Sequence, residues 1–179
     1  VMVFGGDAPG GQGHETTTAQ VVASQFGIEP SDVTITTGDT GTTPFGAGSI
    51  GARAGSYFVS AVAEACSDVK EKITRILAHD LKIEADAHHF EFVNGDVVYI
   101  GDRSLKKPFR EIVERIIMFP IELPEGDAGG LESTAFFEAA KPMICFNADC
   151  CIVEVDANSG DFEIKRWISS EDVGTIINP

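Results

Sequence analysis

The residues best suited to chemistry lie in and just after a glycine-rich stretch, residues 5–13, here called the first loop. From Gly10 to the start of the following pattern the sequence is Gly10-Gly11-Gln12-Gly13-His14-Glu15-Thr16. Glycines let a ligand approach the main chain closely, and the amide of Gln12 offers two donors and one acceptor to a flat heterocycle. A helical pattern follows, so several backbone N–H groups without helical partners are expected to converge there. The loop indicates a site for an anion or a heterocycle, and a plain capped turn is the simpler alternative.

A second glycine-rich loop, residues 38–53, has the same setting between an extended stretch and a helical pattern. The residues expected at the N-terminus of the helix that follows are Ser49, Gly51, Ala52 and Arg53. Their N–H groups, the serine hydroxyl and the guanidinium could together hold a phosphate. In the alternative interpretation, Arg53 pairs with a surface carboxylate such as Asp39. Two such loops in one chain suggest a ligand with a ring system at one end and a phosphate at the other.

Neither common nucleotide-binding motif fits the first loop. No Gly-Lys-Ser/Thr follows it, which excludes a Walker A loop. The G-x-G-x-x-G spacing is missing, and we expect no acidic residue at the end of a second parallel strand, as a dinucleotide fold requires. The acidic residues flanking the loop, Asp7 and Glu15, are expected to be a solvated turn residue and a first-turn helix charge rather than an acid–base pair.

The elements that position these loops follow from hydrophobic periodicity and from glycine and proline positions. Helices are expected over residues 16–26, 49 to about 79, and 108–117, the last capped by Ser104. Strands are expected at 1–4, 33–37 and 131–137, with hairpins over 90–100, turning at Asn94-Gly95, and over 144–169. The fold class is therefore α+β, with mixed helices and antiparallel hairpins, glycine-rich loops at helix N-termini and one long helix. We expect the chain to form part of one domain, divided at most into two subdomains, 1–85 and 86–179.

Composition excludes several classes of protein. The net charge of −15 argues against nucleic-acid binding. No apolar run reaches the roughly 20 residues that a membrane-spanning helix needs, and no export signal is evident. The four cysteines, without C-x-x-C spacing, are expected to be reduced core thiols of a cytoplasmic protein. Both chain ends are expected to be cuts within a longer protein, because the chain starts in a strand pattern and stops just after Ile176-Ile177.

A series of short motifs occurs in a fixed order along the chain. They are Gly11-Gln12-Gly13-His14-Glu15-Thr16-Thr17, Phe26-Gly27, Asp32-Val33, Gly38-Asp39-Thr40, Thr43-Pro44-Phe45-Gly46, Ser49-Ile50-Gly51-Ala52-Arg53, Glu154-Val155-Asp156, Ser159-Gly160 and the final stretch 172–179. Taken together, they resemble the molybdopterin-binding region of the molybdenum hydroxylases, the family of xanthine dehydrogenase, aldehyde oxidase and the carbon monoxide dehydrogenase large subunit. The motifs are most similar to those of the carbon monoxide dehydrogenase large-subunit branch. Any one motif is weak, but the ordered set is specific and spans nearly the whole chain.

The resemblance implies a cofactor, molybdopterin with molybdenum, either as such or as the cytosine dinucleotide. In that family the pterin's dithiolene sulfurs hold the metal, which often has no protein ligand. The implied cofactor-binding residues are Gln12 and Gly13 in contact with the cofactor, His14 and Thr16 nearby, and Ser49, Gly51, Ala52 and Arg53 around its phosphate. The resemblance assigns no metal ligand to this chain.

The sequence departs from the family pattern in three ways. Residues 146–149 stand where many relatives carry a histidine, and Ala52 replaces a common serine. The family's catalytic glutamate lies in a Gly-x-Gly-Glu segment, which does not occur here. No catalytic residue is therefore assigned, and the 179-residue chain alone is expected to be inactive.

The implied function is the cofactor-binding part of an oxidoreductase that hydroxylates an aldehyde, heterocycle or other small carbon centre with oxygen from water. The expected partners are the rest of the molybdenum subunit, subunits or domains carrying iron–sulfur clusters and FAD, and a small-molecule substrate, with no nucleic acid and no membrane span. Two other hypotheses stay open. One is a phosphate- or nucleotide-binding module of another kind, supported by the two loops alone, and the other is a non-catalytic scaffold domain.

Overall fold

The computed structural model describes residues 1–43, 45–140 and 144–178; Pro44 and Pro179, each within one of the ordered motifs, lie outside them. The chain divides into two compact units, Val1–Ala139 and Ala140–Pro179. This boundary differs from the one expected after residue 85, because the elements just after residue 85 share a core with the first two α-helices. No helix in these described ranges is long and apolar enough to cross a membrane.

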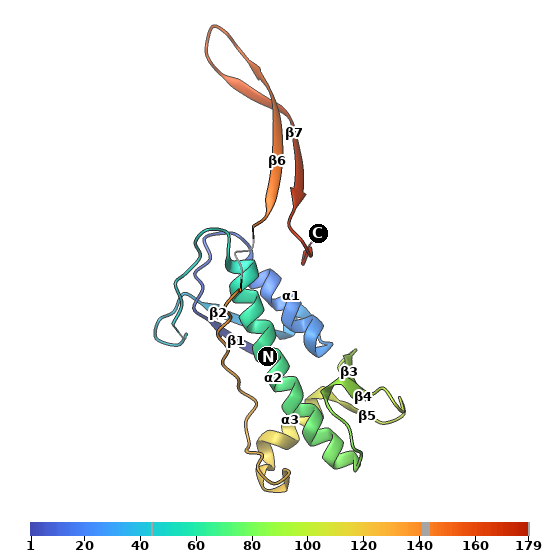
Figure 1. Cartoon of the computed structure of the whole chain (residues 1–179). Coiled ribbons are helices and arrows are strands. Elements are labelled where there is room, and N and C mark those ends of the chain that lie inside the picture. The colour runs from blue at the N-terminus through green and yellow to red at the C-terminus, as the bar shows by residue number, and fades with distance from the viewer. Residues whose placement is uncertain (44, 141–143, 179) are drawn as a thin grey trace. The chain divides into compact units, whose positions relative to one another are not determined.

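The first unit begins with a parallel β-α-β arrangement that carries both glycine-rich loops (Figure 1). Strand β1 (Met2–Gly5) pairs in parallel with β2 (Thr34–Thr37), and α1 (His14–Phe26) makes the crossover. Each loop follows the C-terminal end of one of these adjacent strands, so both leave the sheet at the same edge. Asp39 lies just after β2, so the expectation of no acidic residue at the end of a second parallel strand is wrong.

Helix α1 is bounded by two glycines in the left-handed region. Gly13 is its N-cap with φ 74°, and Gly27 is its C-cap with φ 61°, a conformation that favours glycine. The helix begins at His14 rather than Thr16, because the N–H of Thr17 donates to the carbonyl of Gly13 (3.1 Å) and closes the first turn.

The longest helix, α2 (Ala54–Leu81), begins later than the sequence suggests. Gly51 and Ala52 have φ values of 60° and 55°, which a right-handed helix cannot contain. Arg53 is the N-cap, and its carbonyl accepts from the N–H of Tyr57 at 2.8 Å. Ser49, Gly51 and Ala52 therefore precede the helix instead of forming its first turn, which corrects their expected placement.

A small antiparallel sheet and a third α-helix complete the first unit. The sheet consists of β3 (Phe90–Val93), β4 (Asp96–Tyr99) and β5 (Lys106–Pro108), and the helix is α3 (Phe109–Met118). Positive φ values at Asn94 (51°) and Gly95 (78°) confirm the predicted hairpin turn. Short 3₁₀ helices lie at η1 (Pro30–Asp32), η2 (Ala87–His89) and η3 (Pro120–Glu122).

Two local predictions are wrong. Ser104 does not cap α3, because its hydroxyl donates to Asp102 (2.7 Å) and β5 intervenes before the helix. Residues 131–137 form no strand. Side chains of α2 hold this region instead: Lys72 Nζ donates to the Gly130 carbonyl (2.8 Å), and Asp68 accepts from Ser133 (2.6 Å).

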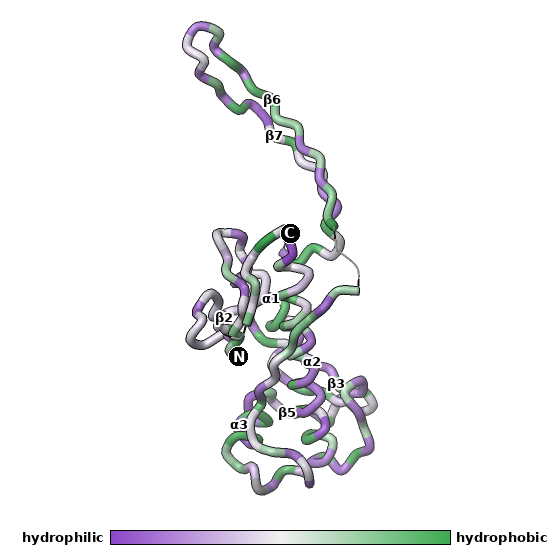
Figure 2. The backbone as a smooth tube through the Cα atoms, turned by 60° about the vertical axis from the view of Figure 1, so that its left-hand side comes forward, coloured by the Kyte–Doolittle hydropathy of each residue, from purple (hydrophilic) through white to green (hydrophobic). Residues whose placement is uncertain are grey.

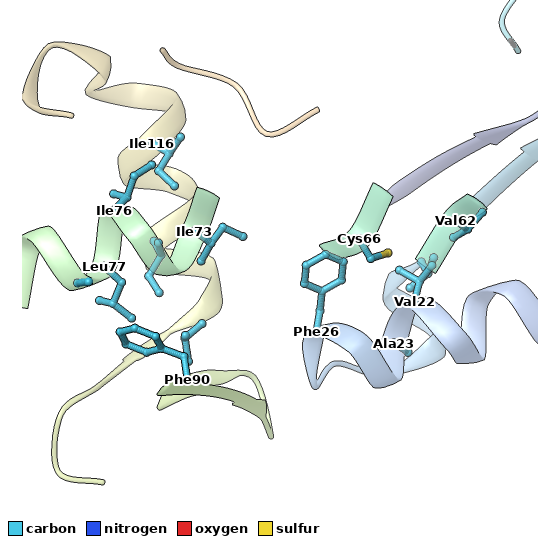
Figure 3. Close-up of a cluster of buried hydrophobic side chains, with 14 of the residues drawn as sticks. Val22, Ala23, Phe26, Val62, Cys66, Ile73, Ile76, Leu77, Phe90 and Ile116 are labelled. Carbon is cyan, nitrogen blue, oxygen red and sulfur yellow. The ribbon is translucent and has the colours of Figure 1, made fainter. Parts of the chain in front are cut away.

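The core lies along α2, as Figure 3 shows. At one end of the helix, Val62 and Cys66 meet Val22 and Phe26 of α1; further along, residues 73–77 meet β3, β4 and α3. The fully buried hydrophobic side chains are Val22, Ile73, Ile76, Leu77, Val97 and Ile116. Ile73, Ile76 and Leu77 belong to the buried hydrophobic stripe of α2, which agrees with the helical periodicity expected for the long helix. Burial also raises the pKa of the Cys66 thiol to about 11, which keeps it neutral.

The second unit contains a long hairpin of β6 (Phe146–Val155) and β7 (Phe162–Asp172), which confirms the predicted hairpin. Hydrophobic and hydrophilic residues both occur along it (Figure 2), and its side chains are exposed. Cys145, Cys150 and Cys151 are exposed as well, so only Cys66 is the core thiol that the sequence led us to expect. The two units together confirm the α+β class, with one parallel strand pair that was not predicted.

Candidate functional site

The first loop presents unpaired backbone donors at the start of α1. Gly13 caps the helix without any side-chain hydrogen bond. The N–H groups of the first turn, His14 to Thr16, have no partner within the helix, and the positive end of its dipole lies behind them. A methyl group at Gly11 (φ 102°) or Gly13 would meet no atom within 4 Å, so the space beside this backbone is open to a ligand.

Gln12 and Thr16 are exposed beside these donors. The side-chain oxygen of Gln12 accepts a hydrogen bond from the N–H of Gly10, which folds the amide back over its own loop. That contact leaves the amide nitrogen with two protons to donate. The structure therefore brings together four of the expected residues, Gln12, Gly13, His14 and Thr16, at one helix entrance.

The second loop contains a cationic side chain, Arg53, and turns at Gly51 and Ala52 before α2 begins. The half-buried guanidinium of Arg53 reaches the Gly48 carbonyl at a long distance, 3.5 Å. Asp39 accepts from the N–H of Gly41 (2.9 Å) within its own turn, and not from Arg53 in the part of the chain that the structure describes. The alternative surface pair between Arg53 and Asp39 is therefore not formed. Next to the turn at Gly51 and Ala52, the N–H groups of Ala54 and Gly55 lack helical partners, whereas that of Ser56 donates to the Arg53 carbonyl (3.1 Å).

The two loops touch through their backbones. A methyl group added to Gly46 would collide with the carbonyl of Gly6, and one added to Gly6 would collide with the backbone of Gly46. Only glycine permits so close an approach. The contact therefore places the first and second loops beside each other.

Asp7 is the residue that the sequence interpretation missed. It is buried, with 5% of its surface exposed. The expectation that Asp7 is a solvated turn residue is therefore wrong. One carboxylate oxygen lies 2.5 Å from His14 Nδ1, and the other accepts from the Ser49 hydroxyl at 2.5 Å. Its place two residues after β1, at the edge from which both loops leave, was the available signal.

This arrangement fits a ligand with a planar, hydrogen-bonding ring and a phosphate. Two helix N-termini, the Gln12 amide and Arg53 supply donors, and the buried carboxylate of Asp7 is already engaged by His14 and Ser49. Exposed Phe45 and Ile50 add apolar surface on the second loop. In residues 1–43, 45–140 and 144–178, no group of three or more histidine, cysteine, aspartate or glutamate side chains could hold a metal ion.

Comparison with known proteins agrees with this chemistry. The model of a molybdopterin cofactor-binding domain matches residues 1–179. The carbon monoxide dehydrogenase large chain of Afipia carboxidovorans is 32% identical over 169 residues, which are 94% of this chain and 20% of the relative. The nicotine 6-hydroxylase large subunit of Paenarthrobacter nicotinovorans is 29% identical over the same shares of both chains.

A solved structure shows the same fold. The crystal structure of a Cu,Mo-CO dehydrogenase in its carbon monoxide-reduced state superposes with a TM-score of 0.82 at 31% identity. The match covers 97% of this chain and 21% of that one, so the chain spans about a fifth of the length of the relatives it matches. Because the family model covers all 179 residues and the structural match covers nearly all of them, the chain belongs to the family of molybdopterin cofactor-binding domains.

Proposed function

We propose that this chain supplies part of the molybdopterin site of an oxidoreductase that hydroxylates an aldehyde, heterocycle or other small carbon centre with oxygen from water. The observation that carries the proposal is the start of α1, where the N-cap Gly13 provides no side-chain hydrogen bond and leaves first-turn N–H groups open beside the Gln12 amide. The matched family supplies the identity of the ligand.

The eight expected residues take different parts in this proposal. Gln12 and Gly13 contact the pterin, with His14 and Thr16 beside them. The segment containing Ser49, Gly51, Ala52 and Arg53 surrounds the phosphate, and its donors are backbone N–H groups and the guanidinium, because the Ser49 hydroxyl already donates to Asp7. When bound, the cofactor supplies the molybdenum at which the substrate is oxidised, while these residues bind and orient it.

The finer features of the enzyme belong to the proposal as well. They are the cytosine dinucleotide form of the pterin, iron–sulfur and FAD partners that accept the electrons, contacts with the rest of the molybdenum subunit, a small-molecule substrate and a cytoplasmic location. The relatives' names support a multi-subunit enzyme, since they include a large chain, a large subunit and a complex subunit gamma. The net charge of −15 supports the absence of a nucleic-acid partner.

Replacing Gln12 with alanine in the full-length protein that contains this chain tests the proposal. We expect lower pterin and molybdenum content with an unchanged thermal melt, because Gln12 is exposed and the lost hydrogen bond at a bound ligand costs about 1–3 kcal/mol. Molybdenum is measured by elemental analysis and the pterin by its fluorescence after release. Wild-type protein that carries a nucleotide and no pterin would favour a different phosphate-binding module.

Arg53→Lys is expected to lower cofactor retention on gel filtration, although the charge is kept. A planar donor with two prongs is replaced by a point charge, which cannot hold two phosphate oxygens in the same way. Arg103→Lys is the matched control, because Arg103 pairs with Glu91 (2.9 Å) on the exposed face of the small sheet. Equal retention by wild type and both variants would mean that Arg53 does not bind the phosphate.

A further inference from the structure

Asp7 joins three segments that are far apart in the sequence. It follows β1, it contacts the first residue of α1 at His14, and it contacts Ser49, 42 residues away, before α2. The carboxylate is almost fully buried, while the side chain of His14 keeps 14% exposure. The second loop and the start of α1 thus share one acceptor group.

The roles of the three groups follow when Asp7 is a carboxylate, since the His14 ring can donate or accept according to its tautomer. An ionised carboxylate only accepts hydrogen bonds, so both partners donate to Asp7. His14 Nδ1 therefore carries a proton, and the other ring nitrogen, Nε2, is the one that can face a ligand. The Ser49 hydroxyl is 3.5 Å from the same Nδ1, and its proton is directed to Asp7 rather than to an anion.

We propose that Asp7 is a positioning residue for the cofactor: it keeps the proton of His14 on Nδ1 and holds the Ser49 segment against the start of α1. This inference rests on the proposed function, since the residues that Asp7 orients belong to the same cofactor site. A ligand that spans two loops gains affinity when the loops are ordered before it arrives, because the ordering cost is then already met. Asp7 supplies that order through two hydrogen bonds.

Two variants with the same number of side-chain heavy atoms compare the loss of both hydrogen bonds with their retention. Asp7→Leu keeps the number and branching of the side-chain heavy atoms but leaves the His14 and Ser49 donors without an acceptor, and we expect about tenfold less pterin per protein than in the wild type. Asp7→Asn keeps an oxygen for His14 and an amide N–H that can donate to the Ser49 oxygen, so we expect retention within about threefold of the wild type. Asp102→Leu is the matched control, because Asp102 accepts from the N–H and hydroxyl of Ser104 (3.0 and 2.7 Å) on an exposed turn.

The experiment measures pterin fluorescence in the full-length protein and the ¹⁵N resonances of its labelled histidines. The His14 signal is identified by its loss in His14→Gln. We expect a protonated Nδ1 in the wild type and in Asp7→Asn, and a changed tautomer in Asp7→Leu. Equal pterin content in Asp7→Leu and Asp7→Asn, or an unchanged His14 tautomer in Asp7→Leu, would overturn the inference. Wild-type protein without pterin would instead contradict the proposed function, and the tautomer would still decide whether Asp7 positions His14.

Discussion

Alanine at position 46 is expected to lower the pterin content of the full-length protein by about tenfold or more. The new methyl group would overlap the carbonyl of Gly6, which is backbone and cannot swing aside as a side-chain end can. The two loops must then separate, at a cost of about 1–3 kcal/mol for overpacking. Because a ligand held by both loops depends on their spacing, even a shift of about 1 Å weakens several of its contacts together. Pterin fluorescence and molybdenum analysis on the purified variant measure the effect.

Gly10→Ala is the matched control for this prediction. A methyl group there meets only the Gln12 side-chain oxygen, at an ordinary 3.7 Å, and the N–H of residue 10 is kept. We expect wild-type pterin content and an unchanged melting temperature. If Gly46→Ala retained as much pterin as Gly10→Ala, the close backbone approach of the two loops would have no role in binding.

Leu77→Ala is expected to lower the free energy of unfolding by about 2–5 kcal/mol, because it removes buried methyl groups and leaves a cavity. Leu77 has no exposed surface and lies in the cluster where α2 meets the small sheet and α3. The two glycine-rich loops lie outside that cluster, so we expect the free energy of unfolding to fall while the pterin content of the folded protein stays unchanged. Urea unfolding followed by circular dichroism gives the free energy.

Ile117→Ala provides the comparison, since 56% of Ile117 is exposed on α3. We expect a change of about 0.5 kcal/mol or less for this surface substitution. Similar losses for Leu77→Ala and Ile117→Ala would show that the core does not lie along α2 as described.

Elements whose signals are local could be predicted from the amino-acid sequence. The stripe on α2, the Asn94-Gly95 turn, the long hairpin of the second unit and the glycine-rich loops all depend on residues close in the chain. The order of the motifs also identified the family, because that order is a property of the sequence alone. Even the α1 boundary was close, since glycine marks both of its ends.

Features that depend on residues far apart in the chain could not be predicted before the fold was known. The start of α2 at Ala54 follows from left-handed φ values at Gly51 and Ala52, and alanine gives no sign of that conformation in a sequence. Residues 131–137 look like a strand, but partners on α2 hold that region instead.

Asp7 shows the same limit at the site itself. In the sequence it is a polar residue in a glycine-rich loop, which is typical of a solvated turn. Its burial arises because β1 and β2 pair in parallel and bring Ser49 back beside His14. A carboxylate becomes an organising group only when its donors converge on it, and that convergence is set by strand pairing rather than by any local pattern.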